Sequence, residues 1–378
     1  MKNILLLPFF RFGNRLNSVT IRTIEIYSRI NKKNFNFIIN LDLKTYNMID
    51  NKYYYDKIKH MDKSYGYAGK NILKLLTGII TTLKNAGKSD YIIGESEYFY
   101  NVLYSYFMHL ISRKPLMITI HIVQPDMYKN NNLVHHIIYK HIFYKAKSLF
   151  ILDNEPIIKE FTNVFKNKIK LFKVTNGIAV NEFYTLDDKI YDLIYIGEIG
   201  DRKNAFMLPD IIETLKKFKK NIKMLIISHL GEIDKFKNLI QERNLNQNID
   251  FIKYVTEEEK REYLAKSKIM VFPTKYEGFG MVIAEALASY LPVVLFDVPT
   301  LKIFDKGTLK AKPFDIDEMV GNIIYLLKNE NIRQKIGNDG RVDALKRFDY
   351  SNVSEIENNA ISGAINYIEN YGVPNDYR

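Results

Sequence analysis

Residues 272–288 read FPTKYEGFGMVIAEALA, and this stretch decides the fold. The apolar run up to Phe272 is typical of a buried strand, Gly278 and Gly280 indicate a loop, and helical periodicity begins at about Gly280. A second apolar strand follows at Val293–Phe296. Strand, helix and strand in this order predict parallel pairing, because the helix carries the chain back to the edge where the first strand began.

The same alternation continues on both sides of this stretch. Other strands of the second half are predicted at Leu193–Ile196, Met224–Ile227, Phe251–Tyr254 and Met270–Phe272. Strands of the first half are predicted at Lys2–Leu7, Asn36–Leu41, Tyr91–Ile93, Leu116–His121, Leu149–Leu152 and Lys170–Val174. Most are continuous apolar runs, as in strands buried on both faces. The prediction is an α/β chain with two Rossmann-like domains whose mostly parallel sheets face each other across a cleft.

A chain of 378 residues is too long for one compact core. Thr175–Tyr191 contains an Asn-Gly turn and follows neither helical nor strand periodicity, so it is the predicted linker. We expect an N-terminal domain over residues 1–185 and a C-terminal domain over 186–351. Residues 352–378 are expected to form a C-terminal helix that can cross back to the first domain.

Composition excludes several classes of protein. With 47% hydrophobic against 26% charged residues the chain can fold, and the absence of cysteine excludes disulfides and thiolate metal sites. The apolar N-terminal run ends at Pro8, too early for a cleavable signal, and charged residues interrupt every candidate membrane span. We therefore expect a cytoplasmic protein, with peripheral binding at the inner membrane surface as an option.

Positive charge is concentrated in the first half. Residues 1–190 carry 28 Lys and Arg against 15 Asp and Glu, whereas residues 191–378 carry 27 against 28. The first half is therefore expected to meet an acidic partner. Within it, Asn51–Lys74 alternates lysine with tyrosine, a composition suited to anionic lipid headgroups. A solvated loop and a site that stacks single-stranded nucleic acid stay open as alternatives.

The loop after Phe272 is a candidate anion site. A helix that opens at about Gly280 directs its free backbone N–H groups and the positive end of its dipole beyond the strand. Glu277 in the loop and Glu285 in the second helical turn are expected at the same cleft, where each carboxylate could hold one end of a nucleotide sugar. Taken alone, two glycines in a loop indicate only a turn.

This loop and further segments of the sequence resemble the motifs of a known family. Glu277 and Glu285, with seven residues between them around Gly-Phe-Gly and with Leu-Pro-Val-Val at 291–294, resemble the signature of retaining glycosyltransferases of family four, group 1. That family has the GT-B fold. The resemblance extends over nearly the whole chain, through Thr119–His121, Thr175–Ile178, Phe183, Tyr195–Lys203 and Lys346–Tyr350.

By this resemblance, His121, Lys203 and Glu277 are the catalytic residues. Lys203 would neutralise charge on the leaving diphosphate without a metal, and Glu285 would bind the ribose hydroxyls. The implied donor-binding set is Gly13, Arg202, Lys203, Gly278, Phe279, Gly280, Met281, Val282 and Glu285. Two positions depart from the family: Glu198 stands where it has arginine, with Arg202 as a substitute cation, and Tyr290 stands where it has glycine.

The predicted function is a retaining, metal-independent transfer of a sugar from a UDP- or GDP-sugar to a glycan or lipid-linked acceptor, with no cofactor. The alternatives are a glycoside hydrolase that uses Glu277 and Glu285, and a non-enzymatic protein that binds nucleic acid or an anionic surface. A hydrolase is disfavoured, because a loop and a helical turn should hold the two carboxylates too far apart.

Three other patterns have simpler interpretations. Asp315 and Asp317 spell the Asp-x-Asp of metal-dependent glycosyltransferases, but their position before a helical run predicts an N-cap. The histidines at 135, 136 and 141 do not share one helix face, which disfavours a metal site. The aromatic run Tyr98–Ile111 is predicted to be a packed core helix rather than a membrane-inserting segment.

Overall fold

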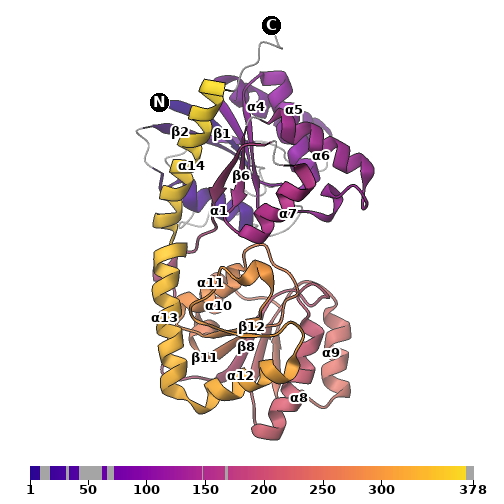
Figure 1. Cartoon of the computed structure of the whole chain (residues 1–378), viewed down its shortest axis with the longest axis vertical. Coiled ribbons are helices and arrows are strands. Elements are labelled where there is room, and N and C mark those ends of the chain that lie inside the picture. Colours follow the sequence, from indigo (N-terminus) through magenta and orange to yellow (C-terminus); the bar gives the residue numbers. More distant parts are fainter. Residues whose placement is uncertain are drawn as a thin grey trace. The chain divides into compact units, whose positions relative to one another are not determined.

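The computed structural model of the chain (Figure 1) describes residues 1–8, 18–30, 34–41, 62–65, 72–146, 148–166 and 169–371. The chain divides into two compact units. Unit 1 comprises Met1–Gly177 and Tyr350–Arg378, and unit 2 comprises Ile178–Asp349. Unit 1 therefore draws on two separate segments of the sequence, whereas unit 2 is one continuous segment.

Among the described residues, unit 1 contains a seven-stranded sheet in the order β3-β2-β1-β4-β5-β6-β7. Its strands are β1 (Lys2–Leu7), β2 (Phe35–Leu41), β3 (Asp62–Tyr65), β4 (Tyr91–Gly94), β5 (Leu116–Ile120), β6 (Ser148–Leu152) and β7 (Leu171–Val174). All neighbours pair in parallel. The central strands are fully buried, for example at Leu5, Ile93 and Ile118, because helices cover both faces.

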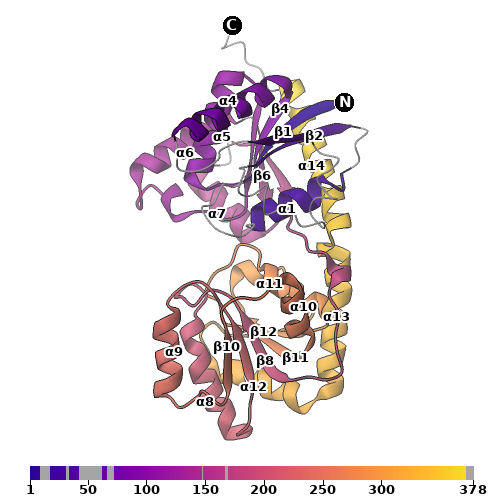
Figure 2. The same ribbon diagram turned by 180° about the vertical axis from the view of Figure 1, so that it is seen from behind.

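The helices of unit 1 are α1 (Ser18–Tyr27), α4 (Ile72–Lys88), α5 (Phe99–Ser112), α6 (Leu133–Lys145), α7 (Glu155–Phe165) and α14 (Tyr350–Tyr371). Figures 1 and 2 show α4, α5 and α6 side by side on one side of the sheet, and α1 with α14 on the other. The C-terminal helix α14 packs against β6, β7 and α1. No helix in the described ranges is both long and apolar enough to cross a membrane.

The described sheet of unit 2 has six parallel strands in the order β10-β9-β8-β11-β12-β13. They are β8 (Tyr191–Ile196), β9 (Met224–Ile227), β10 (Ile249–Ile252), β11 (Ser267–Phe272), β12 (Val293–Phe296) and β13 (Thr308–Ala311). The helices are α8 (Leu208–Phe218), α9 (Ile233–Glu242), α10 (Glu257–Ala265), α11 (Met281–Ala288), α12 (Ile316–Lys328) and α13 (Glu330–Phe348). The predicted α/β class with two parallel-sheet units is confirmed.

Some boundaries differ from the predicted ones. The strand expected at Phe251–Tyr254 is β10, which begins at Ile249 because Ile249 is buried and pairs with Met224, whereas Tyr254 is 54% exposed. The edge strands β3 and β13 were not predicted, because an edge strand needs no apolar run.

The junction between the units lies after Gly177, because the chain from Ile178 onward is bonded to unit 2. The Ile178 amide donates to the Phe348 carbonyl at 2.8 Å. The Arg341 guanidinium donates to the carbonyls of Val180 and Phe183 at 2.6 and 3.2 Å. The predicted linker from Ile178 to Tyr191 is thus part of unit 2.

Candidate active site

Two loops of unit 2 lie side by side because the strands before them are paired. β8 and β11 run parallel, so the loops 197–203 and 273–280 leave the same edge of the sheet. The Lys275 amide donates to the Arg202 carbonyl at 3.0 Å, and the Thr274 hydroxyl donates to the same carbonyl at 3.2 Å. This arrangement brings the predicted residues of both loops together.

The ion pair between Lys203 and Glu277 is the centre of this group. Arg202 Nη1 lies 3.4 Å from the same Glu277 carboxylate. The side chains of Lys203 and Glu277 are only 11% and 14% exposed. Burial lowers the pKa of Lys203, and the Glu277 carboxylate opposes that effect. Lys203 is therefore a buried cation that could exchange its carboxylate partner for phosphate oxygens.

Glu198 faces Arg202, the predicted substitute for the family's arginine. Its Oε2 lies 3.6 Å from Arg202 Nη2, and both side chains are partly exposed. Arg202 thus bridges Glu198 and Glu277. The formal charges of these three residues and Lys203 cancel, so backbone donors would have to supply much of the attraction for a diphosphate.

The start of α11 supplies such donors. Gly280 precedes the helix at a φ of +90°, a left-handed conformation that favours glycine, and an added Cβ there would lie 3.0 Å from Ile283 Cδ1. The amide N–H groups of the first turn, which include those of Met281 and Val282, have no partner inside the helix. Together with the helix dipole they form a site that favours an anion.

Other members of the predicted donor set have different surroundings. The ring of Phe279 is 5% exposed and packs against Phe304 and Phe348, so this side chain belongs to the core of unit 2. Gly278 is the preceding loop residue. Gly13 lies outside the described residues.

Glu285, in the second turn of α11, is 8% exposed. Its Oε1 accepts from the ammonium of Lys260, on α10, at 2.9 Å, and Lys260 also lies 2.7 Å from Glu257. Its Oε2 is buried and has no hydrogen-bond partner in the described part of the chain. Burial raises the pKa of Glu285, and Lys260 opposes that effect. A hydroxyl donor would satisfy the second oxygen, which is costly to bury unpaired.

His121 follows β5 at the carboxyl edge of the unit 1 sheet, as predicted. Its backbone N–H donates to Glu97 Oε2 at 3.1 Å, and its Nε2 lies 3.4 Å from the Glu95 carbonyl oxygen. Burial, and then the charge of Arg22, lower the pKa of His121 well below its usual range. The imidazole is therefore neutral at pH 7 and can form a hydrogen bond to a hydroxyl group.

The two acids beside His121 were not predicted. Glu97 accepts from Gln124 Nε2 at 3.0 Å, and burial raises its pKa to about 7. Glu95 accepts from the Tyr27 hydroxyl and is also buried. Both acids follow β4, which pairs with β5, so the strand-end reasoning that located His121 could have found them.

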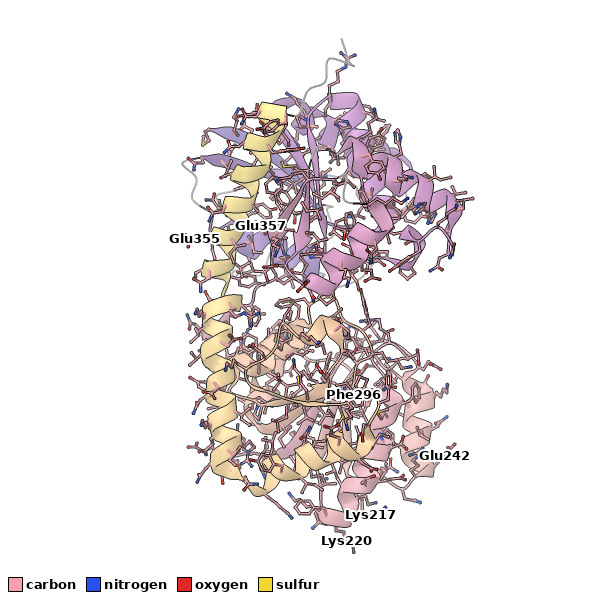
Figure 3. All side chains as sticks on the ribbon, in the orientation of Figure 1. Lys217, Lys220, Glu242, Phe296, Glu355 and Glu357 are labelled. Atoms are coloured by element: carbon pink, nitrogen blue, oxygen red, sulfur yellow. The ribbon has the colours of Figure 1, made fainter. Side chains whose placement is uncertain are left out.

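Arg22 connects α1 to the C-terminal helix. Its Nη2 lies 2.6 Å from Glu357 Oε2 on α14, and its Nη1 lies 3.3 Å from Glu95. All three side chains are at most 4% exposed. Figure 3 labels Glu357 and the neighbouring Glu355 on α14. Arg22 and Glu357 are 335 positions apart, a separation that no local sequence pattern indicates.

The simpler interpretations of two other patterns agree with the contacts. Asp315 caps α12 by accepting from the Glu318 amide at 2.9 Å, which confirms the predicted N-cap. The three histidines contact different groups, namely Asp126 for His135, the Met127 carbonyl for His136 and the Tyr106 hydroxyl for His141.

The structure also accounts for the unusual Tyr290. This residue follows α11 at a φ of 58°, in the left-handed region that favours glycine, the residue the family commonly has there. Its ring lies 5.2 Å from the guanidinium carbon of Arg341, a cation–π contact.

A comparison with known protein families finds a match within unit 2. Residues 181–343 match the family described as Glycosyl transferases group 1. The matched residues include Lys203, Glu277 and Glu285, whereas His121 lies outside them.

Curated proteins similar to this chain include two glycosyltransferases. The chain is 26% identical over 215 residues to a poly(ribitol-phosphate) alpha-N-acetylglucosaminyltransferase of Staphylococcus aureus, over 56% of the chain and 41% of that protein. It is 30% identical over 162 residues to O-antigen chain mannosyltransferase B of Escherichia coli, over 42% of each chain. The chain therefore spans less than half the length of these two relatives.

Solved structures are similar to nearly the whole chain, and so to more than residues 181–343. Anabaena HepE in complex with UDP covers 96% of this chain and 100% of its own, with a TM-score of 0.75 and 13% identity. Sucrose-phosphate synthase from Thermosynechococcus elongatus covers 97% and 100%, with a TM-score of 0.74 and 14% identity. At such identities the likeness shows the fold alone, which is GT-B.

Proposed function

We propose that this protein is a glycosyltransferase that takes its sugar from a nucleoside-diphosphate donor. The observation that carries the proposal is the pairing of two loops, which sets Lys203 and Arg202 beside the loop that leads into α11. A diphosphate at this place would meet two cations and the free amides of a helix N-terminus. Those groups would stabilise the negative charge that develops as the diphosphate leaves.

The donor's nucleoside would be held by Glu285. One oxygen of this buried carboxylate is fixed by Lys260 and the other lacks a donor, which suits a ribose hydroxyl. We propose that the reaction retains the anomeric configuration and needs no metal, as the family resemblance implies. The acceptor is proposed to be a glycan or a lipid-linked acceptor. The names of two curated relatives, which act on poly(ribitol-phosphate) and on an O-antigen chain, support a glycan-type polymer.

Calorimetry with UDP, GDP and ADP in the presence of EDTA tests this proposal. We expect one of them to bind without metal. Lys203→Ala should lower turnover by about 100- to 1,000-fold, the usual cost of one charge-stabilising donor. Glu285→Ala should mainly weaken nucleotide binding. Complete loss of binding on chelation would refute the metal-free claim, and near wild-type kinetics in both variants would refute the site.

The alternative functions have less support. Glu277 and Glu285 are held in separate ion pairs by Lys203 and Lys260, so neither is arranged as the acid or nucleophile of a hydrolase. The Lys/Tyr stretch 51–74, the basis for expecting an anionic membrane surface or nucleic acid, has no described side chains. Its role stays a prediction.

A further inference from the structure

Helix α5 of unit 1 carries apolar side chains on its solvent side as well as on its buried side. Tyr100, Phe107 and Ile111 are 81%, 44% and 50% exposed and recur at helical spacing. Its buried side consists of Asn101, Val102, Ser105 and Met108. Tyr98–Ile111 was predicted to be a packed core helix. The helix is present, but its side that carries Tyr100, Phe107 and Ile111 is exposed rather than packed.

The neighbouring helices extend this exposed apolar surface. Helices α4, α5 and α6 lie side by side (Figure 1), and both neighbours contact α5. We define the three-helix face by its exposed large apolar residues, which are Ile80, Tyr98, Tyr100, Phe107, Leu110, Ile111, Leu133, Val134, Ile137 and Tyr144. They are 10 of the 23 exposed large apolar residues in the described part of the chain. Such a concentration marks an interaction surface.

The charges on these helices have one sign. None of the three helices contains Asp or Glu. Exposed cations on them or at their ends are Lys84, Lys88, Arg113, Lys140 and Lys145. Apolar and tyrosine side chains interspersed with lysine complement a bilayer interface, where the rings enter the headgroup boundary and the cations meet anionic lipid.

We propose that the three-helix face docks on an anionic lipid bilayer. This surface differs from the Lys/Tyr stretch 51–74, and its docking does not depend on the proposed sugar transfer. The bilayer is favoured over a second copy of the chain, because two such faces would bring ten cations together without a carboxylate from these helices.

The chain contains no tryptophan, so one introduced tryptophan reports on one place. Phe107→Trp, in the full-length chain, should shift its emission to the blue with vesicles of phosphatidylcholine and about 30% phosphatidylglycerol, and brominated lipid should quench it. Phe218→Trp, at a similarly exposed phenylalanine of unit 2, is the matched control and should show neither effect. Equal responses at the two positions would overturn the proposal.

Flotation with the same vesicles separates the possible surfaces. Changing Tyr100, Phe107 and Ile111 to serine should lower the vesicle partition coefficient by about tenfold or more. Changing Lys84, Lys88 and Lys140 to glutamate should lower it by a similar factor. The control variant changes Phe218, Tyr325 and Val342 of unit 2 to serine and should float like wild type. Two outcomes would overturn the proposal. In the first, flotation is lost only when residues 51–74 are altered. In the second, the wild-type chain is a dimer, and the serine variant dissociates that dimer but floats like wild type.

A second, independent observation concerns Lys260. This buried lysine holds one oxygen of Glu285 at 2.9 Å while the other oxygen stays without a donor. We infer that Lys260 is a positioning residue that presents the second oxygen to a ligand hydroxyl, an inference that rests on the proposed function. Without Lys260, burial and the charge of Glu257 would both raise the pKa of Glu285, and only the weaker effect of Arg261 would oppose them among the described residues. Glu285 would then keep its proton to higher pH.

Binding of a ribonucleoside diphosphate and its 2′,3′-dideoxy analogue tests this role. The panel of UDP, GDP and ADP identifies the base. Wild type should prefer the ribonucleotide, and Lys260→Met should lose about tenfold in affinity together with that preference. The affinity lost in Lys260→Met should return as the pH rises, and Lys260→Arg should restore binding at pH 7.

Lys266→Met, at the end of the same helix, is the control, because Lys266 pairs with Glu262 instead. An unchanged ribose preference in Lys260→Met would overturn the positioning role. Failure of wild type to bind any of the three nucleotides would instead refute the proposed function.

Discussion

Glu277 and Glu285 are each held by a buried lysine from a neighbouring segment of unit 2. Lys203 comes from the loop after β8, and Lys260 comes from α10. A carboxylate fixed in this way does not have to be reoriented when a ligand binds. At Glu285, burial raises the pKa of the carboxyl and the charge of Lys260 opposes that effect.

Glu198 adds a negative charge beside the two cations of this site. It lies 3.6 Å from Arg202 and occupies the position where the family has arginine. Glu198→Arg removes that pairing and adds two units of positive charge, so nucleotide diphosphate affinity should rise by about tenfold at low salt. Calorimetry at two salt concentrations measures this. An affinity equal to that of wild type would mean that residue 198 does not face the phosphates.

Glu97 should make the stability of unit 1 depend on pH. Its pKa is raised from 4.5 to about 7, so between these values the folded chain retains a proton that the unfolded chain has released. Stability should therefore fall as the pH rises through this range, by about 3 kcal/mol from this group. Glu97→Gln should reduce this slope in urea denaturation, whereas exposed Glu155→Gln should not. Part of the slope should remain in Glu97→Gln, because burial also raises the pKa of Glu95 to about 7. A profile unchanged by Glu97→Gln would contradict the buried-acid assignment.

At the scale of elements, the packing of α11 on α13 depends on close backbone approach. A Cβ added at Gly337 of α13 would lie 2.1 Å from the Tyr290 carbonyl oxygen, just after α11. Gly337→Ala should therefore destabilise the chain by about 2 to 3 kcal/mol. Gly321→Ala on α12 meets nothing within 4 Å and should be neutral or slightly stabilising. Thermal unfolding compares them, and equal effects would contradict the packing argument.

Strands that are buried on both faces of a sheet were predictable from the sequence. Central strands such as β1 and β5 are continuous apolar runs, and these were predicted nearly to the residue. The edge strands β3 and β13 were missed because their sequences, DKSY and TLKA, carry no such pattern. The outward apolar side of α5 was missed because an apolar helix does not reveal from its composition which side is buried.

At the scale of the whole molecule, Glu357 ties the C-terminal helix to the core of unit 1. Among the described residues, Glu357→Gln would leave the buried Arg22 with Glu95 as its remaining carboxylate partner, and this should cost about 3 kcal/mol. Glu355→Gln, on the same helix and exposed, should change stability by less than about 0.5 kcal/mol. Hydrogen exchange in α14, β6 and β7 reports on this contact. Equal protection in the two variants would contradict it.

Long-range pairs limited what the sequence could reveal of the candidate site. The strand-end residues His121, Lys203 and Glu277 were located by motif and by the rule that ligands bind at the carboxyl ends of parallel strands. Lys260 and Arg22 were not, because Glu285 and Glu357, with which they pair, lie on other helices and no local spacing encodes those contacts. Both become visible only once the helices are packed.

The division of unit 1 between two segments sets an order for its maturation on the ribosome. Synthesis delivers Arg22 and Glu95 early, then all of Ile178–Asp349, and only afterwards Glu357. Unit 2 can fold as one continuous piece while the nascent unit 1 still lacks α14 and leaves β6 and β7 partly uncovered. Unit 1 is therefore the later unit to mature, and its unfinished surface is where a chaperone would act.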